Sequence, residues 1–349
     1  MVASVLICLV LVSAVLPYFV GPLGPIASSL QLGTFAQSLS YSNNINRATQ
    51  YLSSHFSENV GLIYESEDSG THWLRLSEFP SFSWSYQQTF WAYSDNLYAS
   101  LALSPFNPSM AQEIATKIRA IPNVGEFLTV SGISVKEYRE VQDVIIAQSP
   151  NFVILSRSYT GRIISPALNY ADERMYYALS LYESGKNTEA KTQFQTAVNM
   201  WNGTCFVDAG VTSSFKGVGA PTDAGFCANN RLGLALFVGK VLAVPVPNSV
   251  NTILWSMQIA NGGIASLSQH GTPIGTANAE TTSLALIQFN DELIHNIQQA
   301  NANLTSNTSS SSSSNGTQTA PNTDWSSYLA AFIIIAIASG YIVMKRRKD

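Results

Sequence analysis

The sequence predicts a mainly α fold, an α/α toroid of helical hairpins, with one C-terminal transmembrane helix. Helix–loop–helix patterns recur from about Asn43 to Ala300. Alternate helices in this range (97–103, 232–241 and 284–289) are apolar nearly all round, which indicates burial on every side. Buried helices that alternate with amphipathic ones predict two concentric helical layers.

The tail predicts how the protein is anchored. Tyr328 to Met344 is apolar and uncharged, and a run of roughly 17–25 such residues spans a bilayer as a helix. We place the span at 326–344 and a basic tail at 345–349, which stays cytoplasmic because Lys and Arg favour that side. Residues 301–325, rich in Ser, Thr and Asn, predict a solvated stalk. The expected localisation is the cell membrane, single-pass type I, with membrane lipid as a partner.

The other end of the chain predicts secretion. Met1 to Val20 is apolar, and small residues follow at Ala27 and Ser28, which is typical of a signal peptide at 1–27. The usual basic residues at its start are missing, so an uncleaved N-terminal anchor is the alternative. Residues 28–300 then form the extracellular domain.

The composition predicts a surface with few charged side chains. Charged residues make up 11% of the chain, against roughly 25% in soluble domains, and the net charge is −4. Uncharged polar groups change little with pH, so one interpretation is an acidic exterior, and the other is a cover of glycans. No basic patch precedes the tail, which argues against nucleic acid as a partner.

Helical spacing, N-cap residues and helix-ending prolines predict the first helices. A helix begins near Asn43. Ser94 is a typical N-cap with Asp95 in the first turn, and Pro105 ends that helix. A further helix covers about Pro108–Ala120.

The middle of the chain is less periodic than its ends. Val135–Gln148 fits a helix, and Asn151–Ser156 fits a short strand. Asn169–Trp201 has the two apolar stripes of an αα-hairpin. Later helices are expected at 232–241, 249–260 and 278–294, with a Gly-rich loop at 261–275.

Two of the three cysteines are expected to form a disulfide. Cys8 falls in the N-terminal apolar run, which leaves Cys205 and Cys227 in the ectodomain. A lone extracellular pair usually bonds, and closing this loop contributes about 3 kcal/mol. Two buried free thiols are the alternative.

Several segments resemble a known fold family. Gln258–Ile264 followed by Gly275–Thr282 resembles the closing hairpin of α/α-toroid proteins of the six-hairpin-glycosidase and terpenoid-cyclase-like kinds. Trp201–Gly203 with Phe206 and Asp208, and Trp91–Asn96, resemble earlier hairpin junctions. The layout as a whole resembles archaeal cell-surface proteins. Such toroids support glycosidases, lyases, prenyl-chain enzymes and non-catalytic domains, so the fold alone does not decide the function. The chain lacks the Asp-rich, zinc-binding and thioester motifs of several of these.

The resemblance implies that buried helices start at one mouth, where carboxylates gather. Glycoside hydrolysis uses two carboxyl groups that flank the scissile bond. The candidate catalytic residues are Asp95, Asp172 and Glu280 near helix starts and Asp208 in a loop. The alternative is structural, because acids in a first helical turn stabilise the helix dipole by about 0.3–1 kcal/mol.

The candidate substrate-binding residues are mostly aromatic. Flat rings beside polar groups suit a sugar. The residues are Trp84, Trp91, Tyr93, Tyr170, Trp201 and His270. The alternative is that the aromatic rings belong to the core and that His270 is a solvated loop residue. No motif for a cofactor or a metal is present.

Four Asn-x-Ser/Thr sequences match the N-glycosylation pattern, at Asn202, Asn303, Asn307 and Asn315. The sequence thus predicts a membrane-anchored extracellular protein that acts on or binds glycans, in the manner of a glycoside hydrolase or lyase. The alternative is a non-catalytic surface-binding or envelope protein.

Overall fold

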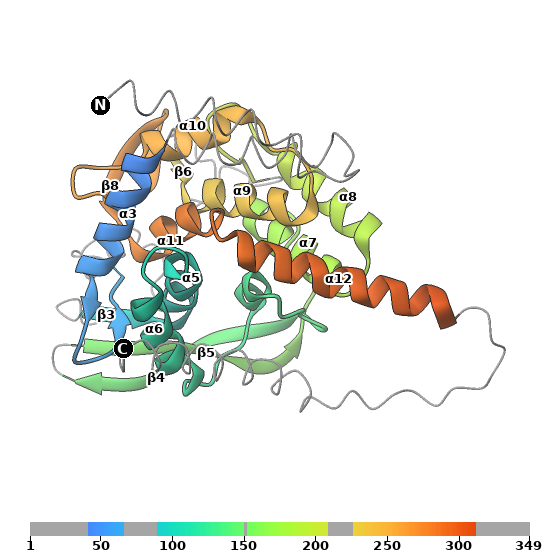
Figure 1. The fold of residues 1–349 in the computed structure, drawn as a ribbon, viewed down its shortest axis with the longest axis horizontal. Helices are drawn as coiled ribbons and strands as arrows, with labels where there is room; N and C mark the ends of the chain where they lie inside the picture. The colour runs from blue at the N-terminus through green and yellow to red at the C-terminus, as the bar shows by residue number, and fades with distance from the viewer. Residues whose placement is uncertain (1–40, 66–88, 150–151, 209–225, 312–349) are drawn as a thin grey trace, which may run out of the picture. The chain divides into compact units, whose positions relative to one another are not determined.

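The computed structural model describes residues 41–65, 89–149, 152–208 and 226–311 (Figure 1). The predicted signal peptide, membrane span and basic tail lie outside these ranges. None of the helices within them is both long enough and apolar enough to cross a membrane. Nearly all of the described residues belong to the compact unit that ends at Thr305.

Helices form most of this unit. They are α3 (Ser42–Ser54), α5 (Tyr93–Leu103), α6 (Pro108–Arg119), the 3-10 helix η2 (Glu126–Ser131), α7 (Ala171–Glu183), α8 (Asn187–Val198), α9 (Asn230–Leu242), α10 (Asn248–Ser256), α11 (Ala279–Ile287) and α12 (Asp291–Ser311). Residues are buried nearly all round α5, α9 and α11, whereas α6 and α8 bury one stripe. The last helix, α12, extends into the range predicted as a stalk.

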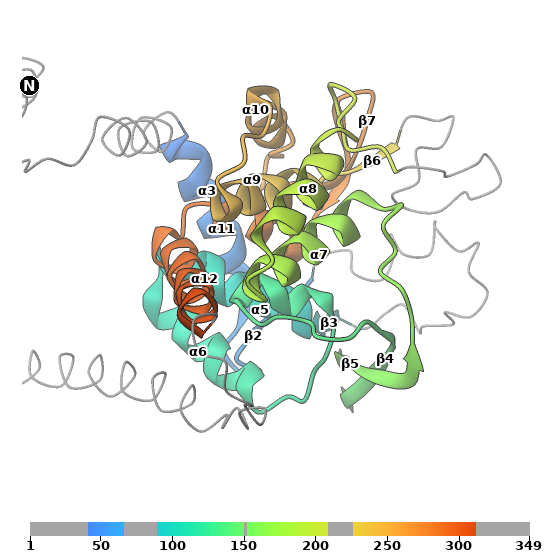
Figure 2. The same ribbon diagram turned by 90° about the vertical axis from the view of Figure 1, so that its right-hand side faces the viewer.

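The core lies where the buried helices meet. α11 packs against α5 and α9, and α9 packs against α7 (Figures 1 and 2). The backbones of α9 and α11 come close together at Gly233 of α9, where a Cβ atom would lie 2.4 Å from the carbonyl oxygen of Leu284 in α11. Only glycine therefore lets these two helix backbones come so near.

Three small sheets accompany the helices. β1 (Phe56–Ser57) and β2 (Leu62–Ile63) form an antiparallel pair. In the second sheet, β5 (Phe152–Ile163) pairs in parallel with β3 (Thr89–Ala92) and antiparallel with β4 (Arg139–Ser149). The third sheet joins β6 (Phe226–Ala228), β7 (Ala265–Gln269) and β8 (Thr272–Ala277) in antiparallel order.

These sheets correct the predicted fold class, because the described chain is a mixed α/β fold and not a mainly α toroid. The stretch 135–148 was predicted as a helix, but most of it is β4, paired with β5 in the register Val144↔Ser156. It contains Val141, Val144, Ile145 and Ile146, and β-branched residues favour strands. The neighbouring strand prediction, 151–156, coincides with the start of β5.

The predicted Gly-rich loop at 261–275 is also wrong in part, because it contains a β-hairpin. β7 and β8 are joined by His270 and Gly271, whose φ angles are both positive, at 50° and 78°. Two consecutive left-handed residues suit the tight turns that match the twist of paired strands. Glycine therefore marks a hairpin turn here.

Candidate functional site

The predicted catalytic carboxylates lie near the starts of three buried helices. Asp95, Asp172 and Glu280 occupy the first turns of α5, α7 and α11. Asp208 lies ten positions after the last residue of α8. The Asp95 and Glu280 carboxyl groups interact electrostatically, and Asp172 also acts on Glu280. The structure therefore brings these acids into one electrostatic network.

A fifth acid, which the sequence did not predict, completes this network. Glu65 follows β2, and its carboxyl group interacts electrostatically with that of Asp95. The Nδ2 atom of Asn278, the N-cap of α11, donates to Glu65 Oε1 at 2.7 Å, and Ala279 N donates to the Glu65 carbonyl at 2.8 Å. Glu65 therefore joins the β2 segment to both α5 and α11. We call Glu65, Asp95 and Glu280 the carboxyl cluster.

Asn96 fixes the position of β2 relative to α5. Its Oδ1 accepts from Ile63 N at 2.7 Å, and its Nδ2 donates to the Ile63 carbonyl at 2.9 Å. These bonds tie the strand to α5 two residues before Glu65. The carboxyl pair thus rests on a fixed backbone and not on two free side chains.

The environment of the pair favours a shared proton. Glu65 and Asp95 are each only 5% exposed. Burial raises the pKa of Glu65 well above its usual value, and the neighbouring Asp95 raises it further. Burial also raises the pKa of Asp95, although hydrogen bonds from Glu65 and Ser94 oppose this. Two interacting carboxyl groups resist ionising together, so the pair favours a state in which one of them keeps its proton.

Glu280 is the third member and is only half-buried. Burial, with the charge of Asp95, raises the pKa of Glu280 to about 7. The Nδ2 atom of Asn230 donates to Glu280 Oε1 at 3.3 Å, and Arg157 favours the ionised form by its charge. A carboxyl group with this pKa changes its charge near neutral pH, which suits acid–base chemistry.

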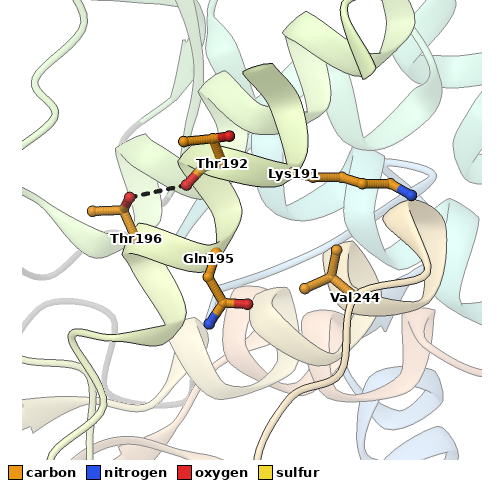
Figure 3. Close-up of a pocket in the computed structure, with 5 residues that line it drawn as sticks. All are labelled: Lys191, Thr192, Gln195, Thr196 and Val244. Atoms are coloured by element: carbon orange, nitrogen blue, oxygen red, sulfur yellow. Dashed lines mark hydrogen bonds between the residues drawn. The ribbon is translucent and has the colours of Figure 1, made fainter. Parts of the chain in front are cut away.

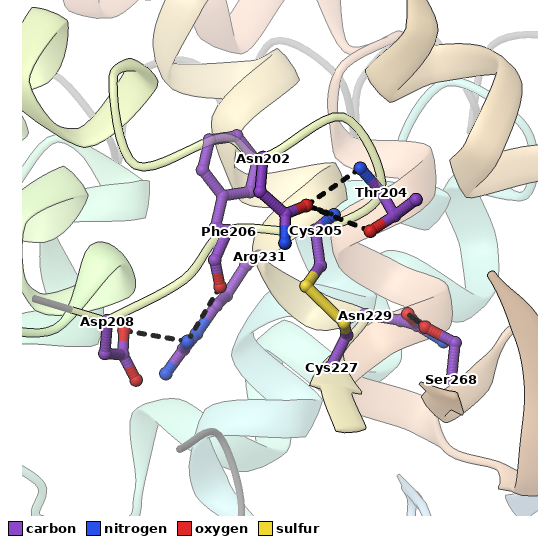
Figure 4. The surroundings of a disulfide bond; sticks show 9 residues. All are labelled: Asn202, Thr204, Cys205, Phe206, Asp208, Cys227, Asn229, Arg231 and Ser268. Atoms are coloured by element: carbon purple, nitrogen blue, oxygen red, sulfur yellow. Dashed lines mark hydrogen bonds and ion pairs between the residues drawn. A yellow bond between two sulfur atoms is a disulfide. The ribbon is translucent and has the colours of Figure 1, made fainter. Parts of the chain in front are cut away.

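Asp172 and Asp208 are arranged differently, because both pair with Arg231 of α9. Arg231 Nη1 lies 2.8 Å from Asp208 Oδ1 (Figure 4). Arg231 Nη2 lies 3.4 Å from Asp172 Oδ1. The Asp208 side chain is fully buried and also accepts from Ala171 N at the start of α7. This group therefore has the partners of a structural ion pair.

A further acid lies beside Asp172 on α7. Burial raises the pKa of Glu173 to about 8, and the charges of Glu126 and Asp172 add to the effect. Glu126 pairs with Arg157 at 3.3 Å, and the guanidinium group of Arg157 lies 5.4 Å from the centre of the Phe127 ring. Arg157 thus acts electrostatically on both Glu173 and the carboxyl cluster.

Two tyrosine hydroxyl groups lie within the field of Glu280. Tyr98 of α5 and Tyr176 of α7 are hydrogen-bonded at 2.8 Å, and both rings are buried. Burial raises the pKa of each phenol well above its usual value. Both hydroxyl groups therefore stay protonated and serve as neutral hydrogen-bond donors.

The structure scatters the predicted substrate-binding residues. Tyr93 is half-buried at the start of α5, with its ring 6.0 Å from that of Phe127. Tyr170 precedes α7 and is half-buried too. Trp201 packs on Phe206 at 5.1 Å, and His270 is exposed in the β7–β8 turn. Trp84 and the side chain of Trp91 lie outside the described residues.

Within the described ranges, no group of three or more His, Cys, Asp or Glu side chains has an arrangement that fits a metal ion. A depression of about 380 Å³ lies elsewhere, along α8 and beside Val244, two positions after the end of α9 (Figure 3). Its lining residues are Lys191, Thr192, Gln195, Thr196 and Val244. This depression contains no residue of the carboxyl cluster.

The predicted disulfide is confirmed, since Cys205 and Cys227 are bonded with their Cα atoms 5.9 Å apart (Figure 4). It joins the segment that carries Asp208 to β6. Ser268 of β7 donates to Asn229 Oδ1 at 2.8 Å just beyond β6. The Cys205–Cys227 disulfide therefore fixes the loop that places Asp208 beside Arg231.

Comparison with known proteins adds no assignment. No family model matches the chain, and no curated protein or solved structure matches it either. The function must therefore be inferred from the geometry and electrostatics of the carboxyl cluster.

Proposed function

We propose that this protein is a glycan-active hydrolase whose chemistry is performed by the carboxyl cluster. The observation that carries the proposal is that the buried Glu65, which accepts from Asn278 at 2.7 Å, interacts with the Asp95 carboxyl group, with Glu280 in the same electrostatic field. Hydrolysis of a glycosidic bond needs one protonated and one ionised carboxyl group. A cluster that holds some of its protons near neutral pH supplies both.

Glu280 is the proposed general acid. A pKa of about 7 keeps it protonated in mildly acidic solution. Asp95 is the proposed base or nucleophile. The hydroxyl group of Ser94, which donates to Asp95 Oδ1 at 3.2 Å, and the charge of Arg157 both favour the ionised form of Asp95, so we assign the retained proton to Glu65. Glu65 then positions Asp95 by donating to it.

The test is a hydrolysis screen of the full-length protein, purified in detergent, with polysaccharides and oligosaccharides as substrates. We expect Glu280→Gln and Asp95→Asn each to lower kcat by about 10²–10⁴, the usual contribution of acid–base catalysis. Glu113→Gln is the matched control, since Glu113 is exposed on α6. Cleavage that survives in both cluster variants would remove the carboxyl cluster from the mechanism.

One observation favours a second candidate, a non-catalytic surface protein that binds glycans or forms part of the envelope. Asp172 and Asp208, two of the four predicted catalytic acids, are paired with Arg231, as expected of structural groups. In this case the wild-type protein binds glycans in an array without cleaving any of them. The variants at Glu280 and Asp95 then bind as the wild type does.

We also propose a type I membrane location, with the described domain outside the cell. The apolar run at 328–344 and the basic residues after it support this, as does the Cys205–Cys227 pair. Protease added to intact cells is expected to remove the domain and leave a short membrane-bound fragment. Protection of the domain until the cells are opened would contradict the proposal.

A further inference from the structure

The turn that follows α8 has a hydrogen-bond pattern that involves one of the four glycosylation sequences. Asn202, Gly203 and Thr204 are all exposed. Asn202 Oδ1 accepts hydrogen bonds from Thr204 N, Thr204 Oγ1 and Cys205 N, each at 2.9 Å (Figure 4). The asparagine and threonine side chains are thus joined directly within an exposed turn.

This pattern occupies the amide oxygen and leaves the amide nitrogen accessible. No described residue accepts a hydrogen bond from Asn202 Nδ2, although three donors converge on Oδ1. Gly203 has a φ of 101°, and a Cβ atom added there would meet nothing within 4 Å. A bulky group on this turn therefore has open space around it.

The turn is also held firmly at its base. Asn202 N donates to the Cys205 carbonyl at 3.0 Å, and Trp201 pairs with Phe206 as an isolated β-bridge. The disulfide of Cys205 with Cys227 fixes one arm of the turn. The sequence is therefore presented in one conformation and does not need local unfolding to become exposed.

The glycosylation sequence at Asn303 is the other one whose side chains the structure describes. Its hydrogen bonds differ from those at Asn202. It lies on α12, where Thr305 Oγ1 donates to the carbonyl groups of Asn301 and Ala302 at 3.2 and 3.0 Å. These are the bonds that threonine makes to the preceding turn of a helix. The hydroxyl group of this sequence is thus engaged by the helix backbone.

We propose that Asn202 is the N-glycosylation site that the folded domain presents, in preference to Asn303. The donor class is a sugar activated by phosphate at its anomeric carbon. Asn202 Nδ2 forms a bond to that carbon, the bond from the carbon to the phosphate oxygen breaks, and the phosphate leaves with the electron pair. Nδ2 loses one proton, and nothing is oxidised or reduced. The modification rests on the proposed extracellular location of the domain.

The test is mass spectrometry of peptides from the full-length protein, isolated from the cells that naturally make it. We expect a glycan on most copies of Asn202 and a lower occupancy at Asn303. Thr204→Ala is expected to remove the mass of one glycan, and Thr204→Ser, which keeps a hydroxyl group, is expected to retain it. The state of Cys205 and Cys227 is measured in the same samples and shows that each variant has folded.

The outcomes separate the modification from the location. If Asn202 is bare while Cys205 and Cys227 are bonded, the glycosylation proposal fails and the extracellular location stands. If Asn202 is bare and both cysteines are reduced, the two proposals fail together. Higher occupancy at Asn303 than at Asn202 also overturns the inference, because it contradicts the role given to the turn.

Discussion

The buried carboxyl groups of Glu65 and Asp95 interact electrostatically with each other at the junction of β2, α5 and α11. Two buried carboxyl groups that interact in this way favour a state in which at least one of them keeps its proton. The contact that joins three elements of the fold therefore depends on protonation, and the stability of the protein should depend on pH in a direction that these residues set.

We expect the protein to be most stable in mild acid. The folded-state pKa is raised in Glu65 and Asp95, to about 7 in Glu280 and to about 8 in Glu173. A raised carboxyl pKa stabilises the fold fully below the unfolded value, about 4, and this contribution is lost as pH rises through the folded value. The free energy of unfolding in urea should fall by about 2 kcal/mol or more between about pH 5 and 8. A constant or rising free energy of unfolding over this pH range would contradict the raised pKa values. The expected outcome also agrees with an acidic exterior, one of the two explanations of the low charge.

Glu65→Gln should remove part of this pH dependence. The amide resembles the protonated acid, because it donates to Asp95 at every pH and still accepts from Asn278. We expect the variant to equal the wild type near about pH 4 and to exceed it by about 1 kcal/mol at about pH 8. Glu113→Gln on exposed α6 serves as the control and should shift neither value. A loss of stability that is the same at both pH values would mean that Glu65 does not share a proton with Asp95.

Local signals in the sequence predicted part of the site. First-turn patterns placed Asp95, Asp172 and Glu280 at helix starts, which the structure confirms, although the predicted N-cap Ser94 lies inside α5, whose N-cap is Ala92. Apolar periodicity likewise identified the buried helices. Both signals act within one or two turns of helix, so they need no knowledge of distant partners.

What the sequence did not predict depends on contacts between distant residues. Glu65 gains its role from Asp95, 30 positions away, and from Asn278, which is 213 positions away. Strands β4 and β5 are fixed by pairing with each other, and β propensity depends on such neighbours. Without these long-range pairs, the helical pattern suggested a toroid.

Arg231→Leu should be strongly destabilising. It would leave the fully buried Asp208 carboxylate without its cation, and breaking a buried pair from one side costs about 3–5 kcal/mol. Arg139→Ala removes an exposed pair with Glu137 and should cost less than about 1 kcal/mol. Urea unfolding of both variants gives the comparison. Equal effects would show that the Asp208–Arg231 pair contributes no more than a surface pair.

Gly233→Ala should also destabilise the fold, although alanine favours helices more than glycine by about 1 kcal/mol. The added methyl group would lie 2.4 Å from the carbonyl oxygen of Leu284, so α9 and α11 must move apart. Overpacking of this kind costs about 1–3 kcal/mol. Thermal unfolding should therefore show a lower Tm, and a raised Tm would mean that the two helices are less closely packed than the structure indicates.

Removing the disulfide should weaken the fold and loosen the loop that carries Asp208. Replacing Cys205 and Cys227 together by alanine opens a loop with a sequence separation of 22, which costs about 3 kcal/mol. Because Asp208 lies three positions beyond Cys205, we expect faster amide hydrogen exchange at Ala171 N, which donates to Asp208 Oδ1. Exchange at Asn96 is the internal control, since this residue lies on α5 and is tied to β2. Equal changes at both sites would indicate that the disulfide acts on the whole fold and not on the Asp208 loop.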